Sequence, residues 1–402
     1  MLTSLICCAL TLLAGFLLKA QCLGGEFNAN AYARLCYNDL QPLFGGRLFA
    51  EDGSRVFPYV HATLDGGFTN GAIEYPVLTG LFMYFSGLLV TDGDGWLRIS
   101  ALMLAPFALW TAYVLARMAG WRSLLWALAP ALVLYAFHNW DLLVVAASVT
   151  GFWLWRRGSP IGAAVMFGIG AGLKMYPVMF LAPLFLEGVM MKDLRRAAGT
   201  ALAGVGTLIA VNLPFALINW EGWSATYVFH KDRGPNFDSI WFFGFPGWAP
   251  DKVNQVTFLL TVAFGVGVLI WAFLRARGTR MYPVLETCGA LLAVFLLWNK
   301  VHSPQYTLWL LPFFALLRVH VAWWVAYALA DLAVYVGIFR WFHDMGIHGM
   351  EELTWAKKLL IGGVWARAAL LLALVVVFLL ARPVEASEPE MEREPEPEGA
   401  PA

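Results

Sequence analysis

The sequence predicts an all-α, polytopic membrane protein with about 12 transmembrane helices and further helices at the outer membrane surface. Of its 402 residues, 60% are hydrophobic and only 13% are charged, a composition typical of membrane proteins rather than soluble enzymes. Lys and Arg together number 27, as do Asp and Glu, so no net charge points to nucleic acid or to an acidic partner.

Twelve apolar runs are long enough, or nearly so, to cross a bilayer at about 20 residues per span. Several are short or interrupted by proline, as happens where helices break beside a cavity. They cover residues 3–22, 97–116, 123–138, 141–155, 160–174, 176–190, 197–217, 256–274, 281–298, 305–317, 320–338 and 359–381.

Basic residues predict the orientation of these runs. Arg and Lys mark every second connection, and the positive-inside rule assigns those connections and both termini to the cytoplasm. The marked positions are 117, 122, 156, 157, 192, 195, 196, 275, 277, 280, 318 and 382. The outer connections are then 23–96, "FHNWD" (137–141), "LKMYP" (173–177), 218–255, "NKVHSPQY" (299–306) and 339–358.

The first outer connection contains one more apolar stretch, residues 74–90. A span here would put the Arg-rich connections outside, so we interpret it as a juxtamembrane or re-entrant helix within the outer loop 23–96. The N-terminal run lacks a basic start and a small-residue cleavage site, so we interpret it as the first membrane helix rather than a signal peptide. The Pro- and Glu-rich tail, 382–402, is predicted to be disordered.

Cysteine and acidic patterns are weakly informative. Cys22 and Cys36 both fall on the outer side, but two cysteines without a dense framework leave open whether they pair. There is no CxxC motif, and the "DGD" at 92–94, which imitates a metal-binding DxD, is typical of turns. Asp331 and Arg367 are expected at similar depth in the last two spans, as a structural ion pair.

Asp39 is the first candidate for chemistry. Residues 28–39 are compatible with a helix that carries apolar side chains on one face, with Asp39 beside that face. Pro42 and the glycines at 45–46 are expected to end this helix. A carboxylate at the membrane–water boundary is placed to meet a lipid substrate, although acids in loops are more often merely exposed.

Lys174 is the second candidate, because it lies in an apolar stretch just before Tyr176. Positive-inside statistics disfavour a lysine at the outer boundary, and cations at this depth tend to serve a pathway or an anion such as phosphate. The alternative is a lysine that snorkels to the outer headgroups. The glycines within 168–172 are expected to allow close helix approach.

Two later outer loops are rich in hydrogen-bond donors. Lys300, His302 and Gln305 lie within "NKVHSPQY", and the ordinary pKa of a histidine is close to physiological pH. The second loop is either a lid over an acceptor or a merely solvated segment, and its polar residues are His230, Lys231, Arg233 and Asp238.

Six segments stand out when they are taken together. In order they are "RLCYNDLQPLF", "FPY", "EYPVLTGLFMYF", "GAGLKMYPVMFLAPL", "GPNFDSIWF" and "NKVHSPQYTLWLLP", which extend from about residue 31 to about residue 317. Together they resemble glycosyltransferase family 87, the actinobacterial polyprenol-phosphate-mannose-dependent mannosyltransferases. Their joint occurrence is more specific than any one of them. The resemblance implies the GT-C membrane fold, with residues 1–381 as the catalytic domain, and a catalytic acid in the first outer loop, where Asp39 lies.

The resemblance also implies the reaction. A mannosyl residue would move, with inversion, from a polyprenyl-phosphate donor to an envelope glycolipid or glycan on the outer face of the plasma membrane. Phosphate is a good leaving group, so one carboxylate suffices as base, and no metal or other cofactor is expected.

Several residues are then candidates to hold the substrates. The donor phosphate and its growing charge are assigned to Lys174, Tyr176, Lys300 and His302, although His302 stands where the family often has an aromatic residue. Further candidate contacts with donor or acceptor are Arg34, Glu74, Tyr75, His230, Lys231, Arg233, Asp238 and Gln305.

Two other classes of function stay open. A transporter or flippase of lipid-linked sugar would use the same outer basic residues for binding alone, although the absence of a clear internal repeat counts against a transporter. A non-catalytic partner of another envelope enzyme would not need Asp39. The sequence also leaves open the acceptor, the choice between mannose and arabinose, and the oligomeric state.

Overall fold

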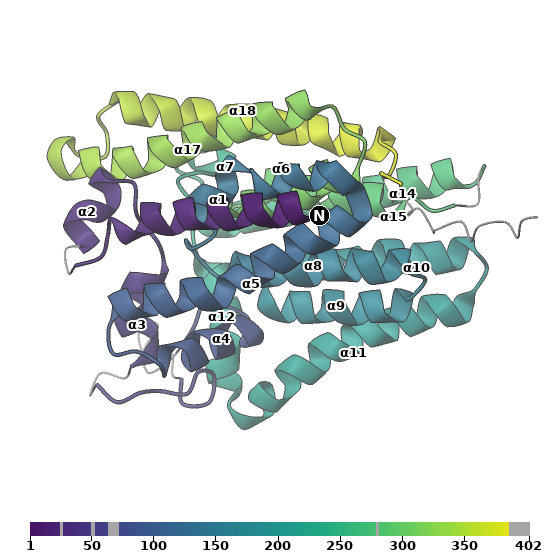
Figure 1. Ribbon diagram of the computed structural model, residues 1–402, viewed down its shortest axis with the longest axis horizontal. Helices are drawn as coiled ribbons and strands as arrows, with labels where there is room; N and C mark the ends of the chain where they lie inside the picture. The colour runs from purple at the N-terminus through teal and green to yellow at the C-terminus, as the bar shows by residue number, and fades with distance from the viewer. Residues whose placement is uncertain (25–26, 50–52, 63–71, 279–280, 386–402) are drawn as a thin grey trace, which may run out of the picture.

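The computed structural model describes residues 1–24, 27–49, 53–62, 72–278 and 281–385. Within these ranges the chain forms eighteen α-helices and three short 3-10 helices, and the only β pairing is two isolated bridges. The long helices run side by side along the longest axis of the molecule, with the connections at the two ends (Figure 1). The all-α, multi-helix class predicted from the sequence is confirmed.

Helical segments occupy all twelve of the predicted spans. They are α1 (Leu2–Ala20), α5 (Gly93–Ala119), α6 with α7 (Leu124–Ala127 and Pro130–Tyr135), α8 (Asp141–Arg156), α9 (Pro160–Leu173), α10 (Leu181–Met190), α11 (Leu194–Ile218), α14 (Pro250–Ala276), α15 (Val284–Trp298), α16 (Thr307–Leu316), α17 (Val321–His348) and α18 (Trp355–Leu380).

Among the described residues, six helices have both the length and the hydropathy of a membrane span. They are α1, α5 with its continuation to Ala127, α11, α14, α17 and α18. Others, such as α9 and α15, are apolar but shorter. The chain is therefore a multi-pass membrane protein, while the number twelve counts helical segments rather than full-length spans.

Short helices gather at one end of the long ones. They are α2 (Phe27–Ala33), α3 (Leu40–Leu48), α4 (Val77–Gly87), α12 (Trp220–Asp232) and α13 (Ile240–Gly244). Figure 1 shows α2, α3, α4 and α12 together on the left, while the connection between α14 and α15, next to basic residues, lies at the opposite end. All five short helices belong to connections that the charge pattern places outside.

The predicted helix over 28–39 is wrong. Helix α2 ends at Ala33, and Leu35 has a left-handed φ of 58°, which turns the chain away from the helix. Asp39 is instead the N-cap of α3, which continues through Pro42 and the two glycines. Pro42 is tolerated there because the first N–H groups of a helix have no intrahelical acceptor.

The apolar stretch 74–90 forms α4, a helix of 11 residues. This is about half the length of a span. Thr79, in the first turn of α4, donates a hydrogen bond of 2.7 Å to the carbonyl of Leu173 at the end of α9. The stretch thus lies against the end of α9 and is too short to cross the membrane.

Three weaker sequence signals concern the cysteines, the "DGD" stretch and the tail. Cys22 and Cys36 form a disulfide, so the end of α1 is tied to the segment that precedes Asp39. In the "DGD" stretch, Asp92 caps α5 and Asp94 accepts hydrogen bonds from main-chain and side-chain groups, which makes the motif structural. The tail 382–402 was predicted to be disordered, but its first residues pair with the end of α16 through a β-bridge between Leu317 and Pro383. The rest of the tail, from residue 386 onward, lies outside the described residues.

Helix packing agrees with two further predictions. A Cβ on Gly168 would lie 2.5 Å from the main-chain oxygen of Gly204, so this glycine lets α9 and α11 approach closely. Asp331 of α17 and Arg367 of α18 form a buried ion pair, with 3.4 Å between Oδ1 and Nη1.

Candidate active site

A cavity of about 950 Å³ opens at the end of the molecule where the outer connections meet. Each of the six predicted outer connections contributes to its lining. The contributing segments are 32–43, 74–76, 138–139, 174–176, 226–238, 299–306 and the part of α17 around 338–342. The charge pattern of the sequence therefore identified one common face, and the fold brings the polar connections of that face together.

Asp39 lines this cavity from the start of α3. Its main-chain N–H donates to the carbonyl of His138 over 2.8 Å, and its carboxylate Oδ2 accepts a hydrogen bond of 2.7 Å from Nδ2 of Asn139. Burial raises the pKa of the Asp39 carboxyl, while hydrogen bonds from Asn139 and Tyr37 and the charge of Lys174 oppose that rise. A carboxylate with a raised pKa is a stronger proton acceptor.

Asn139 connects Asp39 to Lys174. Its side-chain oxygen accepts hydrogen bonds from the main-chain N–H of Trp140 (2.6 Å) and from Nζ of Lys174 (3.2 Å). Its Nδ2 donates to Asp39 and, over 2.7 Å, to the hydroxyl of Tyr75. Because both ends of the amide are committed to partners, its orientation is fixed, with the donor side toward the carboxylate.

Lys174 is buried in the cavity wall. Its Nζ lies 3.4 Å from Oδ1 of Asp141, the first residue of α8, and 4.9 Å and 5.8 Å from the ring centroids of Tyr75 and Tyr306. Trp309 donates a hydrogen bond of 2.7 Å to Asp141. The snorkelling alternative does not hold, because the ammonium is ion-paired and stacked against aromatic faces next to the cavity.

Tyr176 lines the cavity but has its hydroxyl turned into the protein. The hydroxyl lies 3.0 Å from that of Ser148, and the ring stacks on Trp309 with 4.3 Å between centroids. Tyr306 stacks on the same indole at 3.8 Å. These rings form a rigid aromatic base beneath Lys174.

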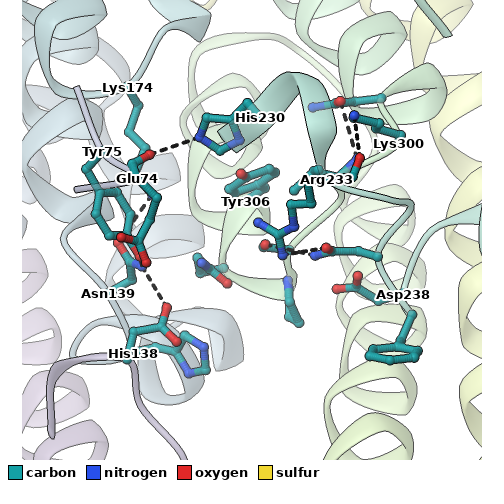
Figure 2. A pocket seen from close by; sticks show the side chains of 18 of the residues that line it. Glu74, Tyr75, His138, Asn139, Lys174, His230, Arg233, Asp238, Lys300 and Tyr306 are labelled. Atoms are coloured by element: carbon teal, nitrogen blue, oxygen red, sulfur yellow. Dashed lines mark hydrogen bonds between the residues drawn. The ribbon is translucent and has the colours of Figure 1, made fainter. Parts of the chain in front are cut away.

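The opposite wall carries Arg233 and Lys300 (Figure 2). The partly exposed Arg233 donates from Nη2 to Asn236 over 2.5 Å. The ammonium of Lys300 donates to the carbonyls of Lys231 (3.1 Å) and Arg233 (2.5 Å) at the end of α12. Lys300 therefore holds the main chain that presents Arg233, and Arg233 is the more accessible cation of the two.

Five further candidates also line the cavity: Glu74, Tyr75, His230, Asp238 and Gln305. Glu74 forms an ion pair of 2.6 Å with Arg47. His230 donates from Nε2 to the Glu74 carbonyl over 2.9 Å, and burial lowers its pKa, so the imidazole is neutral (Figure 2). Burial raises the pKa of Asp238 to about 6, against the opposing charge of Arg367.

Three candidates do not line the cavity: Arg34, Lys231 and His302. The side chains of Arg34 and Lys231 are exposed on the surface. His302 is buried behind the wall, where burial and the charge of Arg367 hold its pKa well below the ordinary value. Its position gives it no contact with a ligand in the cavity.

Sequence reasoning missed the residues that support Asp39. His138, Asn139 and Asp141 all lie in "FHNWD", which was assigned to the outer face without a role for its residues. A histidine, an amide and an acid within five positions between two apolar runs was the available signal. Lys19, buried at the end of α1, donates to the carbonyl of Tyr37 over 2.7 Å and thereby supports the segment before Asp39.

The arrangement has the parts of a transfer reaction at a membrane surface. A buried carboxylate with a raised pKa and two cations line one cavity at the end of a helical membrane protein, an arrangement suited to an anion and a hydroxyl compound side by side. The described residues contain no group of three or more His, Cys, Asp or Glu placed to hold a metal ion. A helical membrane protein with such a cavity fits the class of integral membrane transferases.

The chain belongs to glycosyltransferase family 87, whose model matches residues 73–298. It is similar to GPI mannosyltransferase 1 of Trypanosoma brucei brucei, with 25% identity over 199 residues, 44% of this chain and 46% of that protein. It is also similar to GPI mannosyltransferase 1 of Eremothecium gossypii, with 22% identity over 205 residues, 47% and 50% of the two chains. The aligned part is about half the length of each of these curated relatives.

One solved structure is also similar, that of ArnT from Cupriavidus metallidurans bound to undecaprenyl phosphate. The similarity covers 87% of this chain and 76% of that chain, with 13% sequence identity and a TM-score of 0.39. The family membership of this chain rests on the family model, and it makes the protein a membrane glycosyltransferase.

Proposed function

We propose that this glycosyltransferase moves a mannosyl residue from polyprenyl-phosphate-mannose to an envelope glycolipid or glycan, with inversion at the anomeric carbon. The observation that carries the proposal is Asp39, a carboxylate that faces the same cavity as the cations Lys174 and Arg233. Mannose is supported by the names of the curated relatives, both of which are mannosyltransferases. Residues 1–381 would form the catalytic domain.

In the proposed reaction Asp39 acts as general base. The acceptor hydroxyl gives its proton to the carboxylate while its oxygen forms a bond to C1 of the sugar. The bond between C1 and the phosphate oxygen breaks on the opposite side, and the electron pair leaves with the polyprenyl phosphate. Attack opposite the leaving group inverts the configuration at C1.

The growing negative charge on the phosphate requires nearby positive charge. Arg233 is partly exposed to the cavity and offers a planar set of donors suited to phosphate oxygens. Lys174 adds a buried cation that lines the same cavity, with its Nζ 3.4 Å from Oδ1 of Asp141. Such preorganised charges stabilise the departing phosphate without a metal ion.

Two features support an active site on the extracytoplasmic face of the plasma membrane. The basic connections, which the positive-inside rule assigns to the cytoplasm, are not those that line the cavity. The Cys22–Cys36 disulfide precedes Asp39 at the cavity end of the molecule. Disulfides persist mainly in oxidising compartments outside the cytoplasm.

Transfer by the purified protein in nanodiscs tests this proposal. Radiolabelled polyprenyl-phosphate-mannose and polyprenyl-phosphate-arabinose are compared as donors, with extracted envelope lipids as acceptors and with EDTA present. We expect product from the mannosyl donor, undiminished by EDTA and with inverted anomeric configuration by NMR. Donor that binds but is never transferred would favour the flippase, and activity that EDTA abolishes and a divalent metal restores would contradict the metal-free scheme.

A further inference from the structure

Four aromatic side chains form one wall of the cavity next to Asp39: Tyr32, Tyr37, Phe339 and Phe342. We call them the aromatic wall. Tyr32 stacks on Tyr37 with 5.5 Å between ring centroids and meets Phe342 edge-on at 5.4 Å. Tyr37, two residues before the catalytic candidate, packs on Phe339 at 5.3 Å.

The aromatic wall is not fully covered by the protein. Tyr32, Tyr37 and Phe342 are only partly buried although they lie in a cavity lined by charged groups. Large apolar side chains that stay exposed inside a cavity are typical of a ligand-binding site, because a bound ligand covers them. The open rings therefore need an occupant that is apolar on one side.

The position of the aromatic wall along the membrane normal argues against a lipid chain as that occupant. Helix α17 has 28 residues and is therefore about 42 Å long at 1.5 Å per residue. Phe339 and Phe342 lie about 30 Å from its start, which equals the thickness of the hydrocarbon core. With the start of α17 at the cytoplasmic edge of the core, next to Arg318, the aromatic wall lies at headgroup level, outside the hydrocarbon that holds an isoprenoid chain.

The charges around Asp39 place the donor phosphate and the aromatic wall on different sides of its carboxylate. Lys174, which attracts the phosphate, is joined to one oxygen of Asp39 through Asn139. Tyr37 approaches the same carboxylate from the side of the aromatic wall. A phosphate is repelled by the carboxylate and attracted by the ammonium, so the acceptor hydroxyl has to reach Asp39 from the side of the wall.

We propose that the aromatic wall is the acceptor subsite and that it binds a sugar ring. A pyranose packs the C–H groups of one face on aromatic rings and keeps its hydroxyls free for hydrogen bonds. Stacked in this way, it presents a hydroxyl to Asp39. The inference rests on the proposed function and makes the acceptor a glycan or glycolipid that ends in a sugar, rather than an aliphatic alcohol.

Binding measurements that need no turnover test the subsite. The probes are methyl α-D-mannopyranoside for a sugar ring and farnesyl phosphate for an isoprenoid chain, each titrated by saturation-transfer NMR into the full chain in nanodiscs. The variants are Phe342→Leu and Tyr32→Leu, which keep apolar bulk but remove a ring, and Tyr32→Phe, which keeps the ring. Trp355→Leu is the matched control, because Trp355 is exposed near the same end and does not line the cavity.

Each leucine variant of the wall should raise the Kd of the mannoside about three- to tenfold, since one ring contact is lost. The rise for Tyr32→Phe should be smaller, and farnesyl phosphate should bind all variants alike. A raised Kd for farnesyl phosphate instead of the mannoside, or no change in either from variants that melt like wild type, would overturn the proposal. Because these readings do not use transfer, a wild type that shows this binding pattern but moves no mannose would refute only the proposed function.

Discussion

Replacing Asn139 by leucine tests how its hydrogen bond tunes the pKa of Asp39; the bonds of Asn139 to Lys174, Tyr75 and Trp140 are lost as well. Leucine has nearly the same size as asparagine but cannot donate to the carboxylate, so the 2.7 Å hydrogen bond to Oδ2 is lost. That bond stabilises the ionised form and lowers the pKa of Asp39. Its removal therefore raises the pKa, and a greater share of the base is protonated at any acidic pH.

The expected size follows from the kind of bond that is lost. A hydrogen bond to a charged group contributes about 1.5–3 kcal/mol. On the acidic limb of the pH profile the rate is proportional to the ionised fraction of Asp39, so kcat/KM should fall about 10- to 100-fold there. The whole acidic limb should move to higher pH, while the loss at the plateau should be smaller.

The assay is the pH dependence of kcat/KM for transfer from the lipid-linked donor, because this profile reports the ionisation of the free enzyme. Asn212→Leu is the control: Asn212 is also buried, but it lies in α11 and does not line the cavity. Its profile should match that of wild type. An acidic limb that stays in place in Asn139→Leu would refute the role given to Asn139, and with it the assignment of that limb to Asp39.

Three more outcomes are expected. Lys174→Met should lower the unfolding free energy by about 3–5 kcal/mol, because Asp141 loses its buried partner. The double variant with Asp141→Asn should regain the melting temperature of wild type but should not regain transfer activity. Lys300→Met should raise the KM of the donor with little change in the KM of the acceptor, because Lys300 holds the main chain that presents Arg233. Equal changes in both KM values would contradict this positioning role. Cys22→Ser should cost about 3 kcal/mol in thermal unfolding, the value for closing a loop of this length, and unchanged melting under oxidising conditions would count against the disulfide.

The sequence predicted most of the helices and the face on which the site lies. Hydropathy located all twelve helical segments, because helices packed in a membrane are built from long apolar runs. It did not distinguish full-length spans from the shorter helices, of which there are several among the described residues. Alternation of basic residues grouped the connections that line the cavity. Asp39 and Lys174 were identified because a charge in apolar surroundings stands out in a single sequence.

The hydrogen-bond partners of these charged residues could not be predicted from the sequence. Asn139 meets Asp39 across 100 positions of the chain, and such a contact exists only after the helices have packed. The direction of a loop side chain also depends on that packing. This is why His302 does not line the cavity although its neighbours Val301 and Ser303 do. The break between α2 and α3 was missed because Leu35 adopts a left-handed φ without the glycine or asparagine that usually signals one.

The Asp39→Asn variant removes the proposed base of the glycosyl transfer. Asparagine keeps the shape of the side chain and an oxygen able to accept from Asn139, but it cannot take a proton from the acceptor. The variant should bind the donor and melt like wild type, while kcat for mannosyl transfer falls about 10²- to 10⁴-fold. Transfer within a few-fold of wild type would exclude Asp39 as the base.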